Sequence, residues 1–302
     1  MKNRQFHAFI GITTFTKLLF NIARRLIYPF APEFARGLDV NLSAVTSAIA
    51  VNQATSLLGP LGAGFADRYG YKLLMLLSVA LLTVGCLAAG LIPVYGVLVI
   101  CLFLSGLAKS FFDPSLQAFI GRFVPYEKRG RIIGITEISW AGSTLLGIPA
   151  AGLIIERFAW QTPFVIISVF SLICFFLILK LMPKDHGSSP EAKDSTTIRQ
   201  SWGVILKEKK VIGVLLFVFF MSIANDNLFV IYGAWLESSF GLSLAAIGFG
   251  TVFIGLSEVL GEGCTAFFSD RIGLKKSVVI GTAVCTAAYL LLPVLNTSLF
   301  YV

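Results

Sequence analysis

The stretch Gly62-Ala-Gly-Phe-Ala-Asp-Arg-Tyr-Gly-Tyr-Lys72 is repeated, in related form, in the second half of this sequence. The second copy reads Ala266-Phe-Phe-Ser-Asp-Arg-Ile-Gly-Leu-Lys-Lys276, and both copies contain Asp-Arg-x-Gly-x-Lys. Each copy follows the second long apolar stretch of its half of the chain. A motif that recurs at matched positions predicts two homologous halves.

Each copy has the composition of a tight turn between two helices. Glycine permits backbone conformations that other residues avoid, and aspartate can cap a helix N-terminus or pair with the neighbouring arginine. We therefore expect Gly70 and Gly273 to lie in turns at one membrane face. The alternative is a charge cluster that merely stops membrane insertion.

The composition excludes a soluble globular protein and a disordered one. Of the 302 residues, 56% are hydrophobic and only 13% are charged, and the mean hydropathy is +0.84. Soluble domains are typically about one-quarter charged, and disordered chains lack this much apolar surface. The net charge of +8 fits either nucleic-acid binding or a membrane protein with its positive charge on one side.

Long apolar stretches recur along the whole chain, and each can cross a hydrocarbon core of about 30 Å. The predicted spans are 7–30, 41–66, 72–92, 94–119, 131–156, 159–182, 211–235, 242–268 and 275–294. A tenth begins near Asn296, and the first is not a signal peptide, because it contains Lys17 and no small-residue cleavage site follows it. The predicted fold class is an all-α membrane protein with about nine spans.

The basic residues indicate which side of the membrane each loop faces. Of the 24 lysine and arginine residues, Arg36 and Arg157 are the two that fall in loops on the side opposite the N-terminus. This asymmetry predicts a cytoplasmic N-terminus in the cell membrane, either plasma or inner, and it argues against nucleic-acid binding. Residues 1–182 form a predicted six-helix bundle, 183–210 a polar cytoplasmic linker and 211–302 an incomplete second bundle.

The repeated loops and the six-linker-six layout resemble the major facilitator superfamily. A third loop, Asp113 to Gly130, is similar to the family's Pro-x-x-x-Arg-Gly turn and contains Arg129. The resemblance covers essentially the whole chain and implies a secondary transporter with a central cavity and alternating access. The residues it assigns to cytoplasmic gating loops are Asp67, Arg68, Gly70, Lys72, Arg129, Asp270, Arg271 and Gly273.

The sequence departs from the family pattern at several positions. Ala63 and Ala266 stand where the loop motif usually has glycine, and Tyr71 and Leu274 stand where it usually has a basic residue. Leu102 replaces an arginine that is frequent in the fourth span, which weakens any proton-coupling role inferred from that arginine. A six-plus-six protein has about three further spans, so we expect a fragment or a truncated product.

Charged residues within spans are costly, at roughly 2.5 kcal/mol or more near the bilayer centre, so they usually face a cavity or a partner. Lys17, Asn21, Arg24 and Tyr28 share one face of the first predicted span, with Arg25 beside it. This polar stripe predicts a cavity wall that meets an anionic group. The alternative is that the two arginines extend to the outer interface.

Further polar residues in the spans are candidates for a substrate or proton pathway. Lys109 and Asp113 are spaced to neutralise one another on one helix. Glu137, followed by Trp140, has no basic partner on its own span, so we expect a lysine or arginine from the first or fourth span to pair with it.

The seventh and eighth spans carry carboxylates. Asn225 and Asp226 form a polar break in the seventh span, while Glu258 and Glu262 lie one turn apart in the eighth. Because like charges at this spacing repel, one glutamate is expected to be protonated and to carry protons. The alternative is an ion pair between the halves that latches one conformation.

Gly147, Pro149 and Gly152 resemble the glycine-rich, proline-containing fifth-span motif of the family's antiporters, with one extra residue between Gly147 and Pro149. The following segment, 158–164, resembles exporter sequences. The alternative is close helix packing without a special role.

No motif for catalysis, a cofactor or a metal is present in the sequence. The five cysteines have no metal-binding spacing, there are two histidines, and His-Glu-x-x-His, Gly-x-Ser-x-Gly and the phosphate-loop pattern do not occur. We therefore predict that the chain is not an enzyme and has no metal site.

The predicted function is secondary active transport of a small organic solute by alternating access, with proton-coupled efflux. The expected partners are the solute, protons and the lipid bilayer, with the protein acting as a monomer. Two alternatives stay open: a non-transporting membrane scaffold or partner subunit, and an importer of sugars or organic anions.

Overall fold

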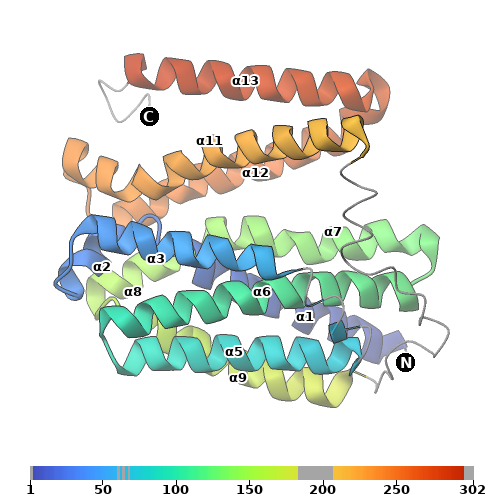
Figure 1. The fold of residues 1–302 in the computed structure, drawn as a ribbon, viewed down its shortest axis with the longest axis horizontal. Helices are drawn as coiled ribbons and strands as arrows, with labels where there is room; N and C mark the ends of the chain where they lie inside the picture. Colours follow the sequence, from blue (N-terminus) through green and yellow to red (C-terminus); the bar gives the residue numbers. More distant parts are fainter. Residues whose placement is uncertain (1–2, 60–61, 63–64, 67–68, 183–206, 296–302) are drawn as a thin grey trace.

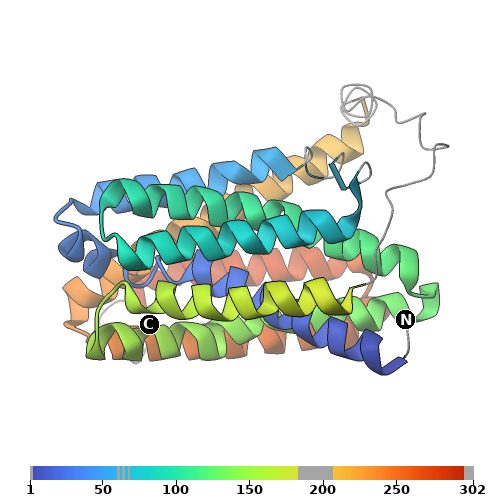
Figure 2. The ribbon, with the colours of Figure 1, turned by 90° about the horizontal axis from the view of Figure 1, so that it is seen from below.

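The computed structural model describes residues 3–295, except 60–61, 63–64, 67–68 and 183–206. The described residues are almost entirely helical, as Figures 1 and 2 show. The helices of the N-terminal part are α1 (Asn3–Arg25), α2 (Ala31–Gly37), α3 (Leu42–Ala54), η1 (Thr55–Leu58), α5 (Tyr71–Leu91), α6 (Tyr95–Phe123), α7 (Tyr126–Gly142), η2 (Ser143–Gly147), α8 (Ile148–Arg157) and α9 (Thr162–Leu181). The C-terminal part contributes α11 (Lys209–Phe240), α12 (Leu244–Ile272) and α13 (Leu274–Leu295).

Eight helices in the described residues are long and apolar enough to cross a membrane. They correspond to eight of the nine predicted spans and confirm the predicted all-α membrane fold. The remaining prediction, 41–66, is described as the shorter apolar helix Leu42–Leu58, because part of that span lies outside the described residues. Asp67 and Arg68, residues 183–206 and the start of a tenth span also lie outside them.

The prediction that the first span continues to residue 30 is wrong. α1 ends at Arg25, a turn covers residues 26–30, and α2 follows. Pro29 explains the break, because proline disfavours helical conformation in the residue before it. The two cations at the end of α1 are favourably placed at the negative end of the helix dipole. Tyr28 therefore lies in a turn and not on the helical face predicted for it.

The span predicted at 131–156 is one continuous rod with a local widening. α7 passes into a π-helical turn, η2, and then into α8, which has Pro149 in its first turn. A π turn accommodates one extra residue within an α-helix. This matches the extra residue that separates Gly147 from Pro149 relative to the antiporter-like motif.

The two repeated loops share an unusual backbone conformation at matching glycines. The φ angles of Gly70 and Gly273 are 92° and 95°, in the region that side chains rarely adopt. This confirms the turns expected there. Lys72 donates a hydrogen bond to the carbonyl oxygen of Leu179 at 2.8 Å, which joins the start of α5 to the end of α9. Arg129 Nε donates to the carbonyl oxygen of Val124 at 2.9 Å.

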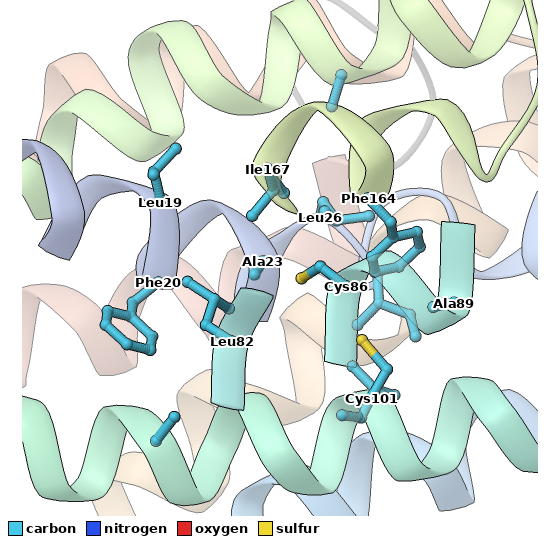
Figure 3. Packing of buried hydrophobic residues seen from close by; sticks show 14 of the residues in the cluster. Leu19, Phe20, Ala23, Leu26, Leu82, Cys86, Ala89, Cys101, Phe164 and Ile167 are labelled. Atoms are coloured by element: carbon cyan, nitrogen blue, oxygen red, sulfur yellow. The ribbon is translucent and has the colours of Figure 1, made fainter. Parts of the chain in front are cut away.

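The core of the N-terminal part surrounds α1, which packs against α5, α6, α7 and α9. Aromatic side chains fill it, and Phe9, Phe20, Phe112 and Phe119 are essentially fully buried. Figure 3 shows buried side chains of α1, α5, α6 and α9 meeting in this core. Small residues permit the closest approach: a Cβ atom on Gly106 of α6 would lie 2.7 Å from the Asn52 carbonyl oxygen of α3.

The C-terminal helices join the rest of the molecule mainly through α12, which packs against α7, η2 and α8 on one side and contacts α13 on the other (Figure 1). The contact is closest near the start of α12. A Cβ atom on Gly152 would lie 2.9 Å from the Leu244 carbonyl oxygen, and one on Gly248 would lie 3.3 Å from the Ile148 carbonyl oxygen. The glycines of both helices thus bring the two backbones together.

Polar contacts reinforce the same end of the interface. Arg36 of α2 pairs with Glu237 of α11 at 2.5 Å and with Glu33 at 2.8 Å. The hydrogen bond to Glu33 and the one to Glu237 raise the pKa of the Arg36 guanidinium, so it remains charged. Glu156 of α8 accepts a hydrogen bond from the backbone N–H of Ala245 at 3.0 Å. We call this region, built from 29–37, 148–156, 233–237 and 244–248, the closed end.

The closed end depends on Gly233, because a Cβ atom there would lie 1.8 Å from the Pro29 carbonyl oxygen. We expect Gly233→Val to push α11 away from the turn and to destabilise the protein by about 1–3 kcal/mol, the usual cost of overpacking. Thermal unfolding of the purified protein measures this effect. Gly213→Val is the matched control on the same helix, since nothing lies within 4 Å of that position. Equal unfolding temperatures for the two variants would contradict the described contact.

Candidate functional site

A cavity of about 480 Å³ lies between the N-terminal helices and the C-terminal helices. Both parts of the chain line it, with α1, the 26–30 turn, α3 and the α7–η2–α8 rod on one side and α11, α12 and α13 on the other. The charged side chains in its wall are Arg24, Arg25 and Asp226. The aromatic side chains are Tyr28, Trp140, Phe217, Phe229 and Tyr232.

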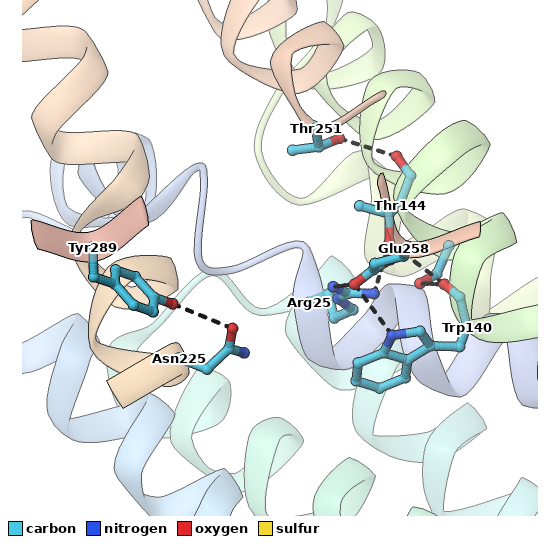
Figure 4. Close-up of polar contacts among 8 residues, drawn as sticks. Arg25, Trp140, Thr144, Asn225, Thr251, Glu258 and Tyr289 are labelled. Carbon is cyan, nitrogen blue, oxygen red and sulfur yellow. Dashed lines mark hydrogen bonds and ion pairs between the residues drawn. The ribbon is translucent and has the colours of Figure 1, made fainter. Parts of the chain in front are cut away.

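One polar cluster in the wall joins the two halves through Arg25 and Glu258. The Arg25 side chain is 9% exposed and its Nη2 lies 2.9 Å from Oε1 of Glu258, on α12. The same carboxylate accepts hydrogen bonds from Trp140 Nε1 at 3.2 Å and from Thr144 Oγ1 at 2.9 Å. Figure 4 shows these side chains converging from α1, the α7–η2 rod and α12.

Arg25 is held by more than the ion pair. Its Nη1 donates a hydrogen bond to Thr144 Oγ1 at 2.7 Å, and its guanidinium lies 4.2 Å from the centre of the Trp140 ring. Phe229 of α11 lies on another side, with its ring centre at 5.6 Å. These contacts compensate for burying the cation, since arginine interacts favourably with aromatic faces.

The π turn contributes to this cluster. Thr144 belongs to η2, and its backbone carbonyl accepts a hydrogen bond from Thr251 Oγ1 of α12 at 3.0 Å (Figure 4). Because a π turn leaves backbone carbonyls without their usual helical partners, such a contact from a neighbouring helix is favourable. The predicted antiporter-like segment therefore lies directly against the cross-half cluster.

A second polar cluster is centred on Gln53 of α3. Its Oε1 accepts a hydrogen bond from Arg24, while its Nε2 donates to the Tyr28 hydroxyl at 2.7 Å and to Asp226 Oδ2 at 3.1 Å. This residue of α3 joins α1 and the 26–30 turn to α11. Gln53 was not predicted from the sequence, although an amide inside an apolar span was a signal that could have identified it.

Two further ion pairs lie within the N-terminal helices. Lys17 Nζ lies 2.5 Å from Glu137 Oε1, the kind of partner expected for this glutamate. Lys109 Nζ lies 2.6 Å from Asp113 Oδ2, the neutralising arrangement expected from their spacing. The second pair lines another cavity, of about 520 Å³, whose wall also includes Arg24. Arg24 thus borders both cavities.

The structure brings together only part of the predicted site. Six of the candidates line the main cavity: Arg24, Arg25, Tyr28, Trp140, Asn225 and Asp226. Glu258 is bonded to this group, whereas Lys17, Glu137 and Asn21 lie apart from it, with Asn21 donating to Ser139. The side chains of Glu262, Asp270 and Arg271 lie outside the described residues.

The cavity placement bears on the two alternatives for the arginines. Arg25 is buried and Arg24 is partly buried, and both side chains line the main cavity. Besides Gln53, the wall residues that the sequence did not single out include Phe217, Met221, Phe229, Tyr232 and Thr251. Within apolar helices these types look like ordinary packing residues, so only their position in space reveals the cavity.

Solved transporters share this fold. The chain superposes on the bacterial homolog of the human lysosomal transporter Spinster, in an inward-facing and unoccupied conformation, with a TM-score of 0.69 at 15% identity. The match covers 91% of this chain and 64% of that one. A D-xylose–proton symporter gives a TM-score of 0.68 at 16% identity, covering 89% of this chain and 70% of that one.

Two sequence relatives are named as a transporter and as a drug-resistance protein. The chain is 28% identical to the uncharacterised MFS-type transporter YceJ of Bacillus subtilis, over 76% of this chain and 58% of that protein. It is 25% identical to the multidrug resistance protein MdtG of Citrobacter koseri, over 89% of this chain and 67% of that protein. The chain thus spans roughly three-fifths to two-thirds of the length of these relatives.

The family model described as Major Facilitator Superfamily matches residues 13–302, nearly the whole chain. This match confirms the resemblance carried by the repeated Asp-Arg-x-Gly loops. With the apolar helices, it shows an integral membrane protein. The chain therefore belongs to the major facilitator superfamily.

Proposed function

We propose that this chain moves a small organic solute across the membrane by alternating access, using the main cavity as its binding site. The observation that carries the proposal is that both halves of the chain line one cavity and share charged contacts across it. A site at the interface of two bundles becomes accessible from the other side when one bundle rocks against the other.

In this proposal the closed end faces the outside and the cavity opens toward the cytoplasm. The closed end includes Arg36 and lies near Arg157, the two basic residues of the outward loops, while the positively charged loops lie at the opposite ends of the spans. The fold similarity to a transporter in an inward-facing conformation agrees with a cavity that opens toward the cytoplasm.

Glu258 is the proposed site of proton coupling. Deprotonated, it pairs with Arg25 and holds α12 against the α7–η2 rod. Protonation would remove the ion pair and one acceptor oxygen, so it would release the two halves from one another. Asp226, Glu137 and Glu262 remain proposed members of the same pathway. The name of another relative, the multi-drug resistance efflux pump PmrA of Streptococcus pneumoniae, which is 24% identical over 93% of this chain and 72% of that protein, supports outward movement of the solute.

Glu258→Gln tests the coupling role. The neutral amide imitates the protonated state, so we expect loss of solute accumulation driven by a proton gradient, with solute exchange across the membrane retained. Reconstituted vesicles with an imposed pH gradient measure both, using ethidium, D-xylose and the aromatic amino acid 3-(2-naphthyl)alanine as solutes.

Glu208→Gln removes the same charge from an exposed position before α11 and serves as the matched control. Undiminished proton-driven accumulation by Glu258→Gln would refute the coupling role. Absence of flux of any of these solutes in wild-type vesicles would instead favour the scaffold alternative.

A cross-link at the closed end tests alternating access. Arg36 and Glu237 are in direct contact, so Arg36→Cys and Glu237→Cys should be joined by a short, reducible bifunctional thiol reagent in a background with the native cysteines replaced by serine. We expect the cross-link to abolish transport and its reduction to restore transport. Each single cysteine variant, treated in the same way, is the control, and full transport by cross-linked protein would contradict the mechanism.

A further inference from the structure

Arg24 and Asp226 differ from the other charges near the main cavity, because neither forms an ion pair within the part of the chain that the structure describes. Arg25, Lys17 and Lys109 each lie within 3 Å of a carboxylate, in pairs with separations of 2.9, 2.5 and 2.6 Å. Arg24 donates instead to the Gln53 amide oxygen, and Asp226 accepts from the Gln53 amide nitrogen.

Gln53 has every polar group of its side chain engaged. Its oxygen accepts from Arg24, and its two N–H groups donate to Tyr28 and Asp226. A neutral amide satisfies hydrogen bonds but supplies no counter-charge to either neighbour. Arg24 and Asp226 therefore face the cavity on either side of one amide group, close enough to attract one another but without a direct ion pair between them.

We infer that the main cavity binds a zwitterionic solute with an apolar, aromatic-sized body. The acidic group of the solute pairs with Arg24, and its ammonium group pairs with Asp226. This inference rests on the proposed function, since it names the substrate class of the same site. A zwitterion gives each of the two residues a direct ion-pair partner and brings no net charge into the membrane interior, whereas a singly charged solute pairs with only one of them and adds a net charge.

The rest of the cavity fits the apolar body of such a solute. Phe217, Phe229 and Tyr232 provide aromatic surface, and Met221 is an adaptable apolar contact. The volume of about 480 Å³ falls within the range of roughly 300–1,000 Å³ that is usual for small-molecule sites. Arginine is well suited to the acidic group, because its planar guanidinium can bind a carboxylate or phosphate with two parallel hydrogen bonds.

Three probes with one naphthyl body separate the charge requirements. They are 3-(2-naphthyl)alanine, which is zwitterionic, 3-(2-naphthyl)propionate, which is anionic, and 2-(2-naphthyl)ethylamine, which is cationic. Equilibrium dialysis with the purified full chain in lipid nanodiscs measures their affinities without requiring transport. We expect the zwitterion to bind roughly tenfold or more tightly than either singly charged probe, as for one added charged hydrogen bond.

Two variants should lose different parts of this selectivity. Arg24→Gln should weaken binding of the zwitterion and the anion without weakening that of the amine. Asp226→Asn should weaken binding of the zwitterion and the amine without weakening that of the anion. The matched controls, Arg157→Gln and Asp39→Asn, change the same charges at exposed positions. Asparagine is also suitable at residue 39, where φ is 53°.

A third variant guards against misfolding of the first two. Gln53→Glu gives Arg24 a carboxylate partner, so it should weaken binding of the anion without weakening that of the amine. Equal affinities of the three probes for the wild type, or variant effects no larger than those of the controls, would overturn the inference. If the protein binds the three probes with the predicted selectivity but shows no flux in vesicles, the inference about the solute stands and the transport proposal is refuted.

Discussion

Burying the Arg25 guanidinium inside the membrane is costly unless a carboxylate and other hydrogen-bond acceptors accompany it. α1 carries this cation at its last residue, and the carboxylate comes from Glu258, more than 200 residues later in the sequence. Thr144 and Trp140 complete its surroundings. The buried arginine is therefore satisfied only when α12 lies against the α7–η2 rod, so its electrostatics depend on how the two halves are placed.

The closed end is held together mainly by close backbone packing, whereas the cavity wall is held by buried polar contacts. There, Gly152, Gly233 and Gly248 permit backbone to meet backbone, and the Arg36–Glu237 ion pair is partly exposed. An exposed ion pair contributes little to stability, typically below about 1 kcal/mol, so the close packing supplies most of the cohesion. A contact built from shape and weak surface charge can separate and form again at modest cost, which suits the proposed alternating access.

Sequence patterns predicted the all-α fold, the repeated turns and most charged residues of the cavity, because membrane burial makes long apolar runs and their interruptions conspicuous. The end of α1 at Arg25 was not predicted, since hydropathy continues through the turn and only Pro29 marks the break. The pairing of charges was also beyond prediction. The sequence left Glu258 open between a proton carrier and an ion pair between the halves, and it named no partner; Arg25 becomes its partner only because the fold brings distant helices together. Gln53 could have been noticed as an amide within an apolar span, but its contacts with Arg24 and Asp226 could not be predicted, because they join three separate elements.

Adjacent residues of α1 take part in the two polar clusters of the cavity. Because neighbouring positions on a helix point about 100° apart, Arg25 faces α12 and the π turn while Arg24 faces α3. Both side chains are carried by the same last turn of α1, so a movement of that turn changes both clusters together. The Arg25 cluster contains a direct ion pair between the halves, whereas in the other cluster Arg24 and Asp226 are joined only through the amide of Gln53. Solute binding at Arg24 would therefore act on the turn that also carries the cross-half ion pair, which provides a short physical route from binding to conformational change.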